Sequence, residues 1–248
     1  MSIILNMNLP LDIKNKIESL AESYSVSDLK KSSASISDKY LNESGKGDRL
    51  VISKKDVLTY AIIRMPATFA ALSGAFERCL PYMDDEIHSV LDLGSGTGSG
   101  VLACSYLINN KYDITCLERE DEMINFVKSN IDNTPNFIKH DSSKGLPNIH
   151  SDLVISSYFL NELDDNSRDV VLNDIWNNAN KYILIVEPGT PNAFKMIKYI
   201  RDYYLSKGGY IVGPCPHSGI CPLAKDDWCH FVTRVTRSRL HKLLKDAD

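Results

Sequence analysis

The sequence predicts an α/β protein built on one doubly wound, parallel sheet. Its 248 residues fit one large domain with an appendage. After Ser89, short β-branched or Leu-rich runs alternate with helical segments, which is the pattern of a parallel sheet with crossover helices. The composition, 43% hydrophobic and 24% charged, is that of a globular chain and excludes a disordered protein or a coiled coil.

The segment before the sheet, residues 1–88, is predicted to be a helical lead-in. Apolar residues recur at helical spacing over Leu11–Tyr24 and again over Lys55–Phe76, where Pro66 interrupts the pattern. The stretch from Ser32 to Asp48 is rich in Ser, Asp, Asn and Gly, and we expect it to be a mobile connection between helices.

Residues 89–207 form the expected sheet domain. The predicted strands are its short apolar runs: Ser89–Leu93, Ile114–Leu117, Asn136–Lys139, Leu153–Ser156 and Tyr182–Val186. The predicted helices are the amphipathic segments between and after them: Ser99–Asn109, Glu120–Ile131, Ser167–Asn178 and Thr190–Lys207. This alternation is typical of a Rossmann-like fold.

A glycine-rich loop follows the first strand, in the sequence VLDLGSGTGSGVLA at 90–103. Glycines let the backbone approach a ligand and turn N–H groups toward it at the positive end of a helix. Dinucleotide folds use G-x-G-x-x-G, whereas here the spacing is G-x-G-x-G and Asp92 stands two residues before Gly94. A carboxylate there repels pyrophosphate but suits an amino group and a ribose, so we predict S-adenosylmethionine as the ligand.

Three further polar positions follow the next strands. Glu118 can accept hydrogen bonds from both ribose hydroxyls, Asp141 lies where an adenine amino group is expected, and Ser156 begins a segment over the ligand's reactive end. Each acid could instead be an ordinary cap of a helix N-terminus. Together they favour adenosylmethionine over NAD or ATP. The predicted cofactor-binding residues are Asp92, Gly94, Ser95, Gly96, Gly98, Glu118, Asp141 and Ser156.

The fourth strand names no catalytic residue unambiguously. It ends in Ser-Ser-Tyr-Phe, where enzymes that methylate exocyclic amines often have Asn/Asp-Pro-Pro-aromatic. The sequence has no cysteine near this strand that could attack C5 of a pyrimidine. Asn161, in YFLNEL, is a candidate for orienting a methyl acceptor, or else a cap of the following helix.

Residues 208–248 form a cysteine-rich extension that closes with a basic helix, Thr236–Lys245. Cys215, Cys221 and Cys229 fall within GPCPHSGICPLAKDDWCHF, and in a reducing compartment this spacing is typical of a zinc or iron–sulfur site. Packing of apolar thiols in a turn is the alternative. The other three cysteines lie in predicted helices or strands and are assigned to the core: Cys79, Cys104 and Cys116.

The net charge of −4 gives no overall attraction to nucleic acid, so an RNA contact would need a local patch. The basic end of the chain is such a patch, or else a solvated helix face. No apolar stretch reaches the length of a membrane span, and the first residues do not form a secretory signal. We therefore expect a cytoplasmic protein, or a mitochondrial matrix protein if the source is eukaryotic, with no membrane and no DNA partner.

Five motifs spread over roughly residues 50 to 245 indicate a family. They are RMPATFAA (64–71), VLDLGSGTGSG, SYFLNEL (157–163), VEPGTPNAF (186–194), and CPHSGICPL followed by DWCHF. Together they resemble the small-ribosomal-subunit methyltransferase-like family, which comprises the mitochondrial small-subunit assembly factor and its bacterial relatives. The resemblance implies a Rossmann-like methyltransferase fold that uses S-adenosylmethionine, and association with the small ribosomal subunit and its rRNA during maturation.

The resemblance also implies a [4Fe–4S] site on four cysteines, three of which correspond to Cys215, Cys221 and Cys229. The fourth lies further downstream in the family than Asp248, so this chain would be a truncated form, or complete the site with His217 or His230, or leave it unfilled.

Three functions follow from these expectations. The first is an enzyme that transfers a methyl group to small-subunit rRNA, and the second is a non-catalytic ribosome-assembly factor with a metal or iron–sulfur site. The third, a small-molecule methyltransferase, leaves the cysteine segment and the basic end without a role.

Overall fold

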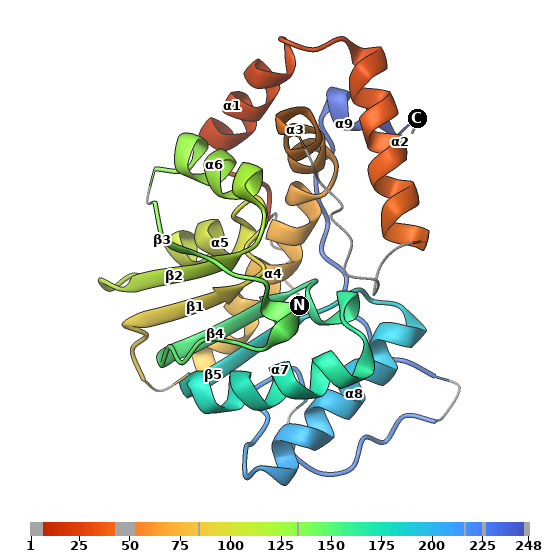
Figure 1. The fold of residues 1–248 in the computed structure, drawn as a ribbon. Coiled ribbons are helices and arrows are strands. Elements are labelled where there is room, and N and C mark those ends of the chain that lie inside the picture. The colour runs from red at the N-terminus through yellow and green to blue at the C-terminus, as the bar shows by residue number, and fades with distance from the viewer. Residues whose placement is uncertain are drawn as a thin grey trace.

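The computed structural model describes residues 7–42, 53–83, 85–132, 134–215, 217–224 and 227–245 (Figure 1). Five strands form one sheet in the order β3-β2-β1-β4-β5, and every neighbouring pair is parallel. The strands are β1 (Ser89–Leu93), β2 (Asp113–Glu118), β3 (Asn136–Lys139), β4 (Ser151–Ser157) and β5 (Ala179–Val186). The predicted Rossmann-like α/β fold is confirmed, and β4 and β5 begin earlier than expected.

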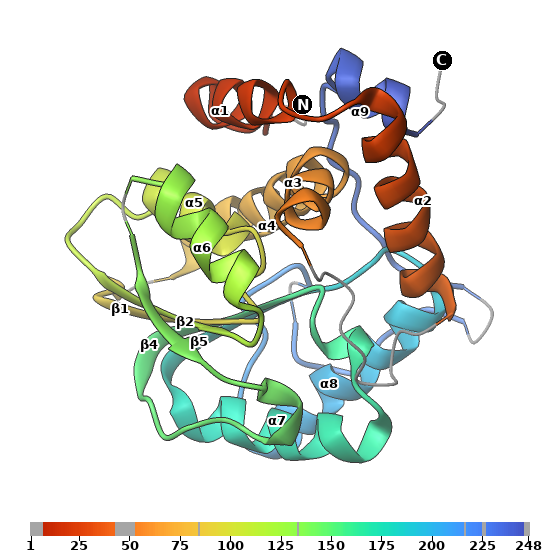
Figure 2. The ribbon, with the colours of Figure 1, turned by 45° about the horizontal axis from the view of Figure 1, so that its top comes forward.

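Helices cover both faces of the sheet, which gives three layers (Figures 1 and 2). The four helices predicted between and after the strands are present as α5 (Ser99–Leu107), α6 (Asp121–Asn130), α7 (Asp165–Asn178) and α8 (Pro191–Ser206). Sheet residues alternate between two cores: Val90 and Ile155 pack with α5 and α6, whereas Leu91 and Val154 pack with α7 and α8. This alternation is what a strand buried on both faces requires.

The lead-in forms α1 (Leu11–Ala21), α2 (Val26–Asn42), α3 (Lys54–Ile63) and α4 (Met65–Cys79). The axes of α3 and α4 differ by 52° at Arg64, just before Pro66, which matches the interruption expected there. Taken together, the two helices have the length and apolar composition of a bent membrane span. No single helix of the described residues does.

The expected mobile connection from Ser32 to Asp48 is wrong over its first part, because residues 32–42 belong to α2. Leu29 and Ile36 are buried seven residues apart on one face, and Ser32 on the same face donates a hydrogen bond to Asp56 Oδ1 at 2.6 Å. Tertiary packing therefore outweighs the low helix preference of the serines. Residues 43–48 lie outside the described residues.

The last helix, α9 (Arg239–Leu244), is shorter than predicted and packs with the lead-in. Leu244 belongs to the same core as Ile13, Leu29 and Phe69, and the His241 ring nitrogen Nδ1 lies 3.1 Å from the Ile62 carbonyl oxygen. The beginning and end of the described chain are thus joined on one face of the sheet (Figure 2).

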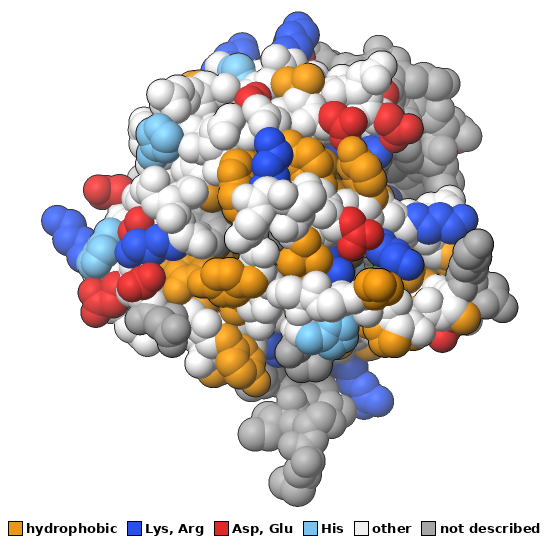
Figure 3. Space-filling view, turned by 90° about the horizontal axis from the view of Figure 1, so that it is seen from below, with side chains coloured by type: hydrophobic (Ala, Val, Ile, Leu, Met, Phe, Trp, Pro, Cys, Tyr) orange, Lys and Arg blue, Asp and Glu red, His pale blue; other side chains and the backbone are white. Residues whose placement is uncertain are grey.

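Between α8 and α9 the described residues form no helix or strand. This extension runs along the lower side of the molecule beside α7 and α8, where Figure 3 shows apolar side chains interspersed with charged ones. Exposed apolar residues of α7, α8 and the extension include Val170, Tyr199, Tyr210 and Ile220.

Candidate functional site

The glycine loop after β1 adopts a backbone that requires glycine. Gly94, Gly96 and Gly98 have φ values of +62°, +52° and +88°, in the left-handed region. A Cβ on Gly98 would also come within 2.6 Å of the Ile131 side chain. The loop therefore makes a tight turn at the predicted position, between the buried strand β1 and the start of α5.

Most N–H groups of this loop are already bonded to β2. Those of Gly94 and Ser95 donate to the Leu117 carbonyl at 2.9 and 3.3 Å, and that of Gly96 donates to Glu118 Oε2 at 2.8 Å. Glu118 Oε1 accepts the N–H of Glu120 at 2.9 Å. Glu118 thus fixes the loop, and its carboxylate, which also accepts from the Arg119 N–H, has acceptor capacity left for a ligand hydroxyl.

Asp92 is only 2% exposed, and its Oδ2 has no hydrogen-bond partner within the described part of the chain. Its carboxyl lies against Gly100 of α5, where any Cβ would overlap it. Burial, followed by the charge of Glu118, raises the pKa of Asp92 to about 7, and burial also raises the pKa of Glu118. Two acids therefore lie below the loop at the carboxyl ends of β1 and β2.

Asp141 follows β3 and acts as a cap. Its Oδ1 accepts from the Ser143 hydroxyl at 2.6 Å and the Ser143 N–H at 3.3 Å, at the start of a 3₁₀ turn, Ser142–Lys144. Partial burial opposes ionisation, but these bonds and the nearby Lys144 lower the pKa of Asp141. The capping alternative is therefore realised here, and a role toward adenine stays a prediction.

Ser156 and Asn161 lie on either side of the turn that leaves β4. Ser156 is 1% exposed, and its Oγ has no partner among the described residues. Asn161 is exposed in a 3₁₀ turn, Leu160–Glu162. The next helix, α7, is capped by Asp164, which accepts the Ser167 N–H at 3.0 Å, so the alternative that Asn161 caps this helix is wrong.

Glu187 is a half-buried acid at the same edge that sequence reasoning missed, and its Oε2 is buried. It directly follows β5, and its Oε1 accepts the Leu160 N–H at 2.9 Å. Arg168 of α7 binds the other side of this turn, because its guanidinium donates to the carbonyls of Leu160 at 3.1 Å and Leu163 at 2.6 Å. A charge immediately after a buried strand, in VEPGTP, was the signal that could have indicated Glu187.

The three extension cysteines lie near one another without forming a finished site. Burial, together with the neighbouring thiols of Cys215 and Cys221, raises the pKa of Cys229. Cys215 and Cys221 are half-buried, and Cys229 is exposed. Even so, no three His, Cys, Asp or Glu side chains of the described residues are placed to hold a metal ion.

The assignment of the other cysteines to the core holds in two cases of three. Cys104 and Cys116 are fully buried, whereas Cys79, at the end of α4, is only half-buried.

The extension is attached to the edge that follows β5. The Trp228 indole donates to the Gly189 carbonyl at 3.3 Å, and its ring stacks on His230 with centroids 5.8 Å apart. Arg201 of α8 donates to the carbonyl of Gly219 at 2.6 Å. The cysteine segment is thus placed beside the loop that contains Glu187.

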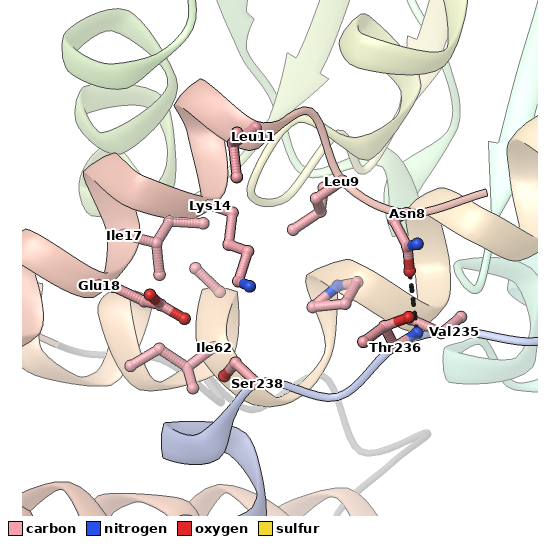
Figure 4. A pocket seen from close by; sticks show the side chains of 12 residues that line it. Asn8, Leu9, Leu11, Lys14, Ile17, Glu18, Ile62, Val235, Thr236 and Ser238 are labelled. Atoms are coloured by element: carbon pink, nitrogen blue, oxygen red, sulfur yellow. Dashed lines mark hydrogen bonds between the residues drawn. The ribbon is translucent and has the colours of Figure 1, made fainter. Parts of the chain in front are cut away.

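A cavity of about 300 Å³ lies between α1, the bend at Pro66 and residues 235–238 (Figure 4). Apolar side chains form most of its wall, and Thr236 N donates to Asn8 Oδ1 across one end at 2.9 Å. None of the predicted site residues lines it.

Comparison with known proteins identifies relatives over most of the chain. The family described as mitochondrial small ribosomal subunit Rsm22 matches residues 54–248. Human "Ribosome assembly protein METTL17, mitochondrial" is 25% identical over 203 residues, which cover 70% of this chain and 42% of that protein. "Rsm22-cox11 tandem protein 2, mitochondrial" of Schizosaccharomyces pombe is 26% identical over 224 residues, covering 80% and 30%. The chain spans less than half the length of these relatives.

Solved structures match parts of this chain. A putative RNA methyltransferase from Pyrococcus horikoshii has a TM-score of 0.41 and 20% identity, over 56% of this chain and 67% of that one. DhpI in complex with SAH has a TM-score of 0.42 and 21% identity, over 51% and 59%.

Proposed function

Because the chain belongs to the Rsm22 family of mitochondrial small ribosomal subunit proteins, we propose that it binds S-adenosylmethionine and acts on or with a small ribosomal subunit. The observation that supports this most is Asp92, a buried carboxyl with an unpartnered oxygen in the described structure, beside a glycine loop held by Glu118. A buried acceptor without a donor is costly, and a ligand amino group would satisfy it.

Residues at the ends of neighbouring strands would each bind a different part of the cofactor. Asp92 would take the amino group, the loop from Gly94 through Ser95 and Gly96 to Gly98 would lie beneath the ligand, and Glu118 would accept the ribose hydroxyls. Asp141 and Ser156 would lie beside the adenine and the reactive end. When bound, the cofactor supplies a methyl group already activated by the sulfonium, so the chain's contribution is positioning.

Calorimetry with S-adenosylmethionine tests the cofactor site. We expect the wild-type chain to bind, and Asp92→Asn and Glu118→Gln to weaken binding about tenfold each, since each loses a charge-assisted bond. Asp164→Asn, at the exposed cap of α7, is the matched control and should bind as wild type. Absence of wild-type binding at millimolar ligand would reject the proposal.

The acceptor we propose is small-subunit rRNA. If the cofactor binds, transfer of labelled methyl to isolated small-subunit RNA identifies an enzyme. The second candidate, a ribosome-assembly factor that binds the cofactor without turnover, is supported by the name of the human relative, a ribosome assembly protein. Cofactor binding without transfer would favour this second function. Both relatives are named as mitochondrial, so we propose the mitochondrial matrix as the compartment.

We propose the exposed basic side chains at the end of the chain as the RNA contact: Arg234, Arg237, Arg239 and Lys242. Lys245 differs from these four, because its ammonium is bound to the Ser37 hydroxyl at 2.8 Å. If the four contact phosphates, charge-neutral variants should bind RNA more weakly and with a smaller salt dependence, whereas Lys245→Gln should not.

We further propose that Cys215, Cys221 and Cys229 bind an iron–sulfur cluster, or alternatively zinc. The thiols of Cys215 and Cys221 lie near enough to Cys229 to raise its pKa, which supports this proposal, and the three would have to close around a metal, since they do not form a finished site. Iron and zinc analysis of anaerobically purified protein is the test, with Cys104→Ser as the control for thiol loss in the core. Neither metal above background would contradict the proposal.

A further inference from the structure

The carboxyl ends of β4 and β5 bring Glu187 beside the reactive end of the proposed cofactor site. Ser157 of β4 pairs in register with Val186 of β5, so Glu187 follows at the level of Tyr158. The Tyr158 N–H donates to the Val186 carbonyl at 2.8 Å, which joins the two strand ends. Because Ser156 stands just before this point, Glu187 lies on the acceptor side of the site.

Three buried oxygens at these two strand ends have no hydrogen-bond partner among the residues that the structure describes. They are the hydroxyls of Ser156 and Ser157 and Oε2 of Glu187. The other oxygen of Glu187 is bonded to Leu160 and therefore holds the side chain in place. A set of buried, unpaired oxygens is completed by a ligand that brings hydrogen-bond donors.

The surrounding turn is held rigidly. Tyr158 has a φ of +56°, a conformation that a non-glycine residue keeps only where its surroundings impose it. On the far side, Arg168 binds the carbonyls of Leu160 and Leu163. Glu187 is thus positioned before any ligand binds, as an acid–base group must be.

The charged and titratable groups that face Glu187 are Tyr158 and Glu162 from the segment after β4, and Arg168 from α7. Burial, with a contribution from the charge of Glu162, raises the pKa of Glu187 to about 8, although the N–H groups of Leu160 and Asn161 and the Arg168 guanidinium favour the charged form. A base with a pKa near neutrality is suited to accept a proton during a reaction.

We propose that Glu187 accepts the proton of the methyl acceptor, and that the acceptor is therefore an N–H or O–H group. In this step the acceptor atom forms a bond to the methyl carbon with its lone pair. The bond from that carbon to sulfur breaks and leaves its electron pair on sulfur, while the acceptor's proton moves to the Glu187 carboxylate. The inference rests on the proposed function, whose cofactor supplies the methyl group.

The test uses sinefungin, which carries an ammonium where the transferable methyl lies, against adenosylhomocysteine, which carries nothing there. A carboxylate on the acceptor side should make wild type prefer sinefungin by about tenfold. The preference should be larger at pH 8.5 than at pH 6.5, because Glu187 ionises across that range. Glu187→Gln keeps an acceptor for Leu160 and should lose both the preference and its pH dependence.

Asp164→Asn is the control, because it removes an exposed acid at the start of α7 and should leave the preference between the two ligands unchanged. An undiminished sinefungin preference in Glu187→Gln, or none in wild type, would overturn the role of Glu187. If wild type binds neither ligand, the cofactor proposal itself fails. Thermal melting of each variant separates these results from unfolding.

Discussion

At the scale of single residues, burial raises the pKa values of Asp92, Glu118 and Glu187 at the candidate site. The positions of Asp92 and Glu118 could be predicted because strand ends and glycine spacing are local patterns. Their surroundings could not be predicted: that Glu118 binds Gly96, or that Asp92 lies against Gly100, depends on how β1, β2 and α5 pack. Glu187 directly follows a strand, which was a usable local signal, but its position beside Tyr158 depends on the pairing of β4 with β5.

The raised pKa of Asp92 predicts a pH-dependent stability. An acid with a higher pKa in the folded state stabilises the fold below its unfolded pKa of about 4, and this contribution is lost as pH rises through about 7. The Asp92→Asn variant has no carboxyl to ionise at this position. The difference in free energy of unfolding, variant minus wild type, should therefore increase by roughly 2–4 kcal/mol from pH 4 to pH 8.5. Urea unfolding at both pH values measures this, and parallel pH profiles would contradict it.

The glycine loop makes a second prediction at this scale. Gly98→Ala must place a Cβ against Ile131 in a left-handed backbone, so we expect a loss of about 1–3 kcal/mol and weaker cofactor binding. Gly208→Ala is the matched control, since it has a φ of +92° but no atom within 4 Å of the added Cβ. If the two variants lose equal stability, backbone strain alone explains the effect, and contact with Ile131 does not.

At the scale of elements, periodic apolar segments were predictable and α2 was not. The strands and crossover helices follow apolar runs that pack on both faces of the sheet, and their local pattern agrees with their tertiary role. In α2, serines obscure a buried face that only Leu29, Ile36 and the bond from Ser32 to Asp56 define. The helix is stabilised by packing against other helices, which its composition does not indicate.

The bond between Ser32 and Asp56 gives the prediction for this element. Ser32→Ala removes a 2.6 Å hydrogen bond between α2 and α3 and should lower the free energy of unfolding by about 1 kcal/mol. Ser35→Ala, on the exposed side of α2, should change it by less than about 0.5 kcal/mol. Chemical denaturation of both variants measures the difference, and equal effects would show that α2 gains nothing from this bond.

At the scale of the whole molecule, one core unites parts that the sequence suggested as separate segments. The lead-in helices, the upper face of the sheet and α9 bury residues in a single cluster. At the other end of the sheet, the extension meets the loop after β5 through Trp228 and Gly189. Such long-range packing leaves no local signature, which is why the segments could be located from sequence but their union could not.

Because the lead-in helices, the sheet and α9 share one hydrophobic core, we expect the lead-in and the sheet to unfold together. Leu244 of α9 is 4% exposed in the shared core, so Leu244→Ala should destabilise the protein by about 2–4 kcal/mol. The preceding residue, Leu243, is 43% exposed, and Leu243→Ala should cost less than about 0.5 kcal/mol. Hydrogen exchange followed along the chain should show protection falling in α2, α3 and β1 alike for Leu244→Ala. Loss confined to the lead-in, with β1 unchanged, would show instead that residues 1–88 fold as a separate unit on the sheet domain.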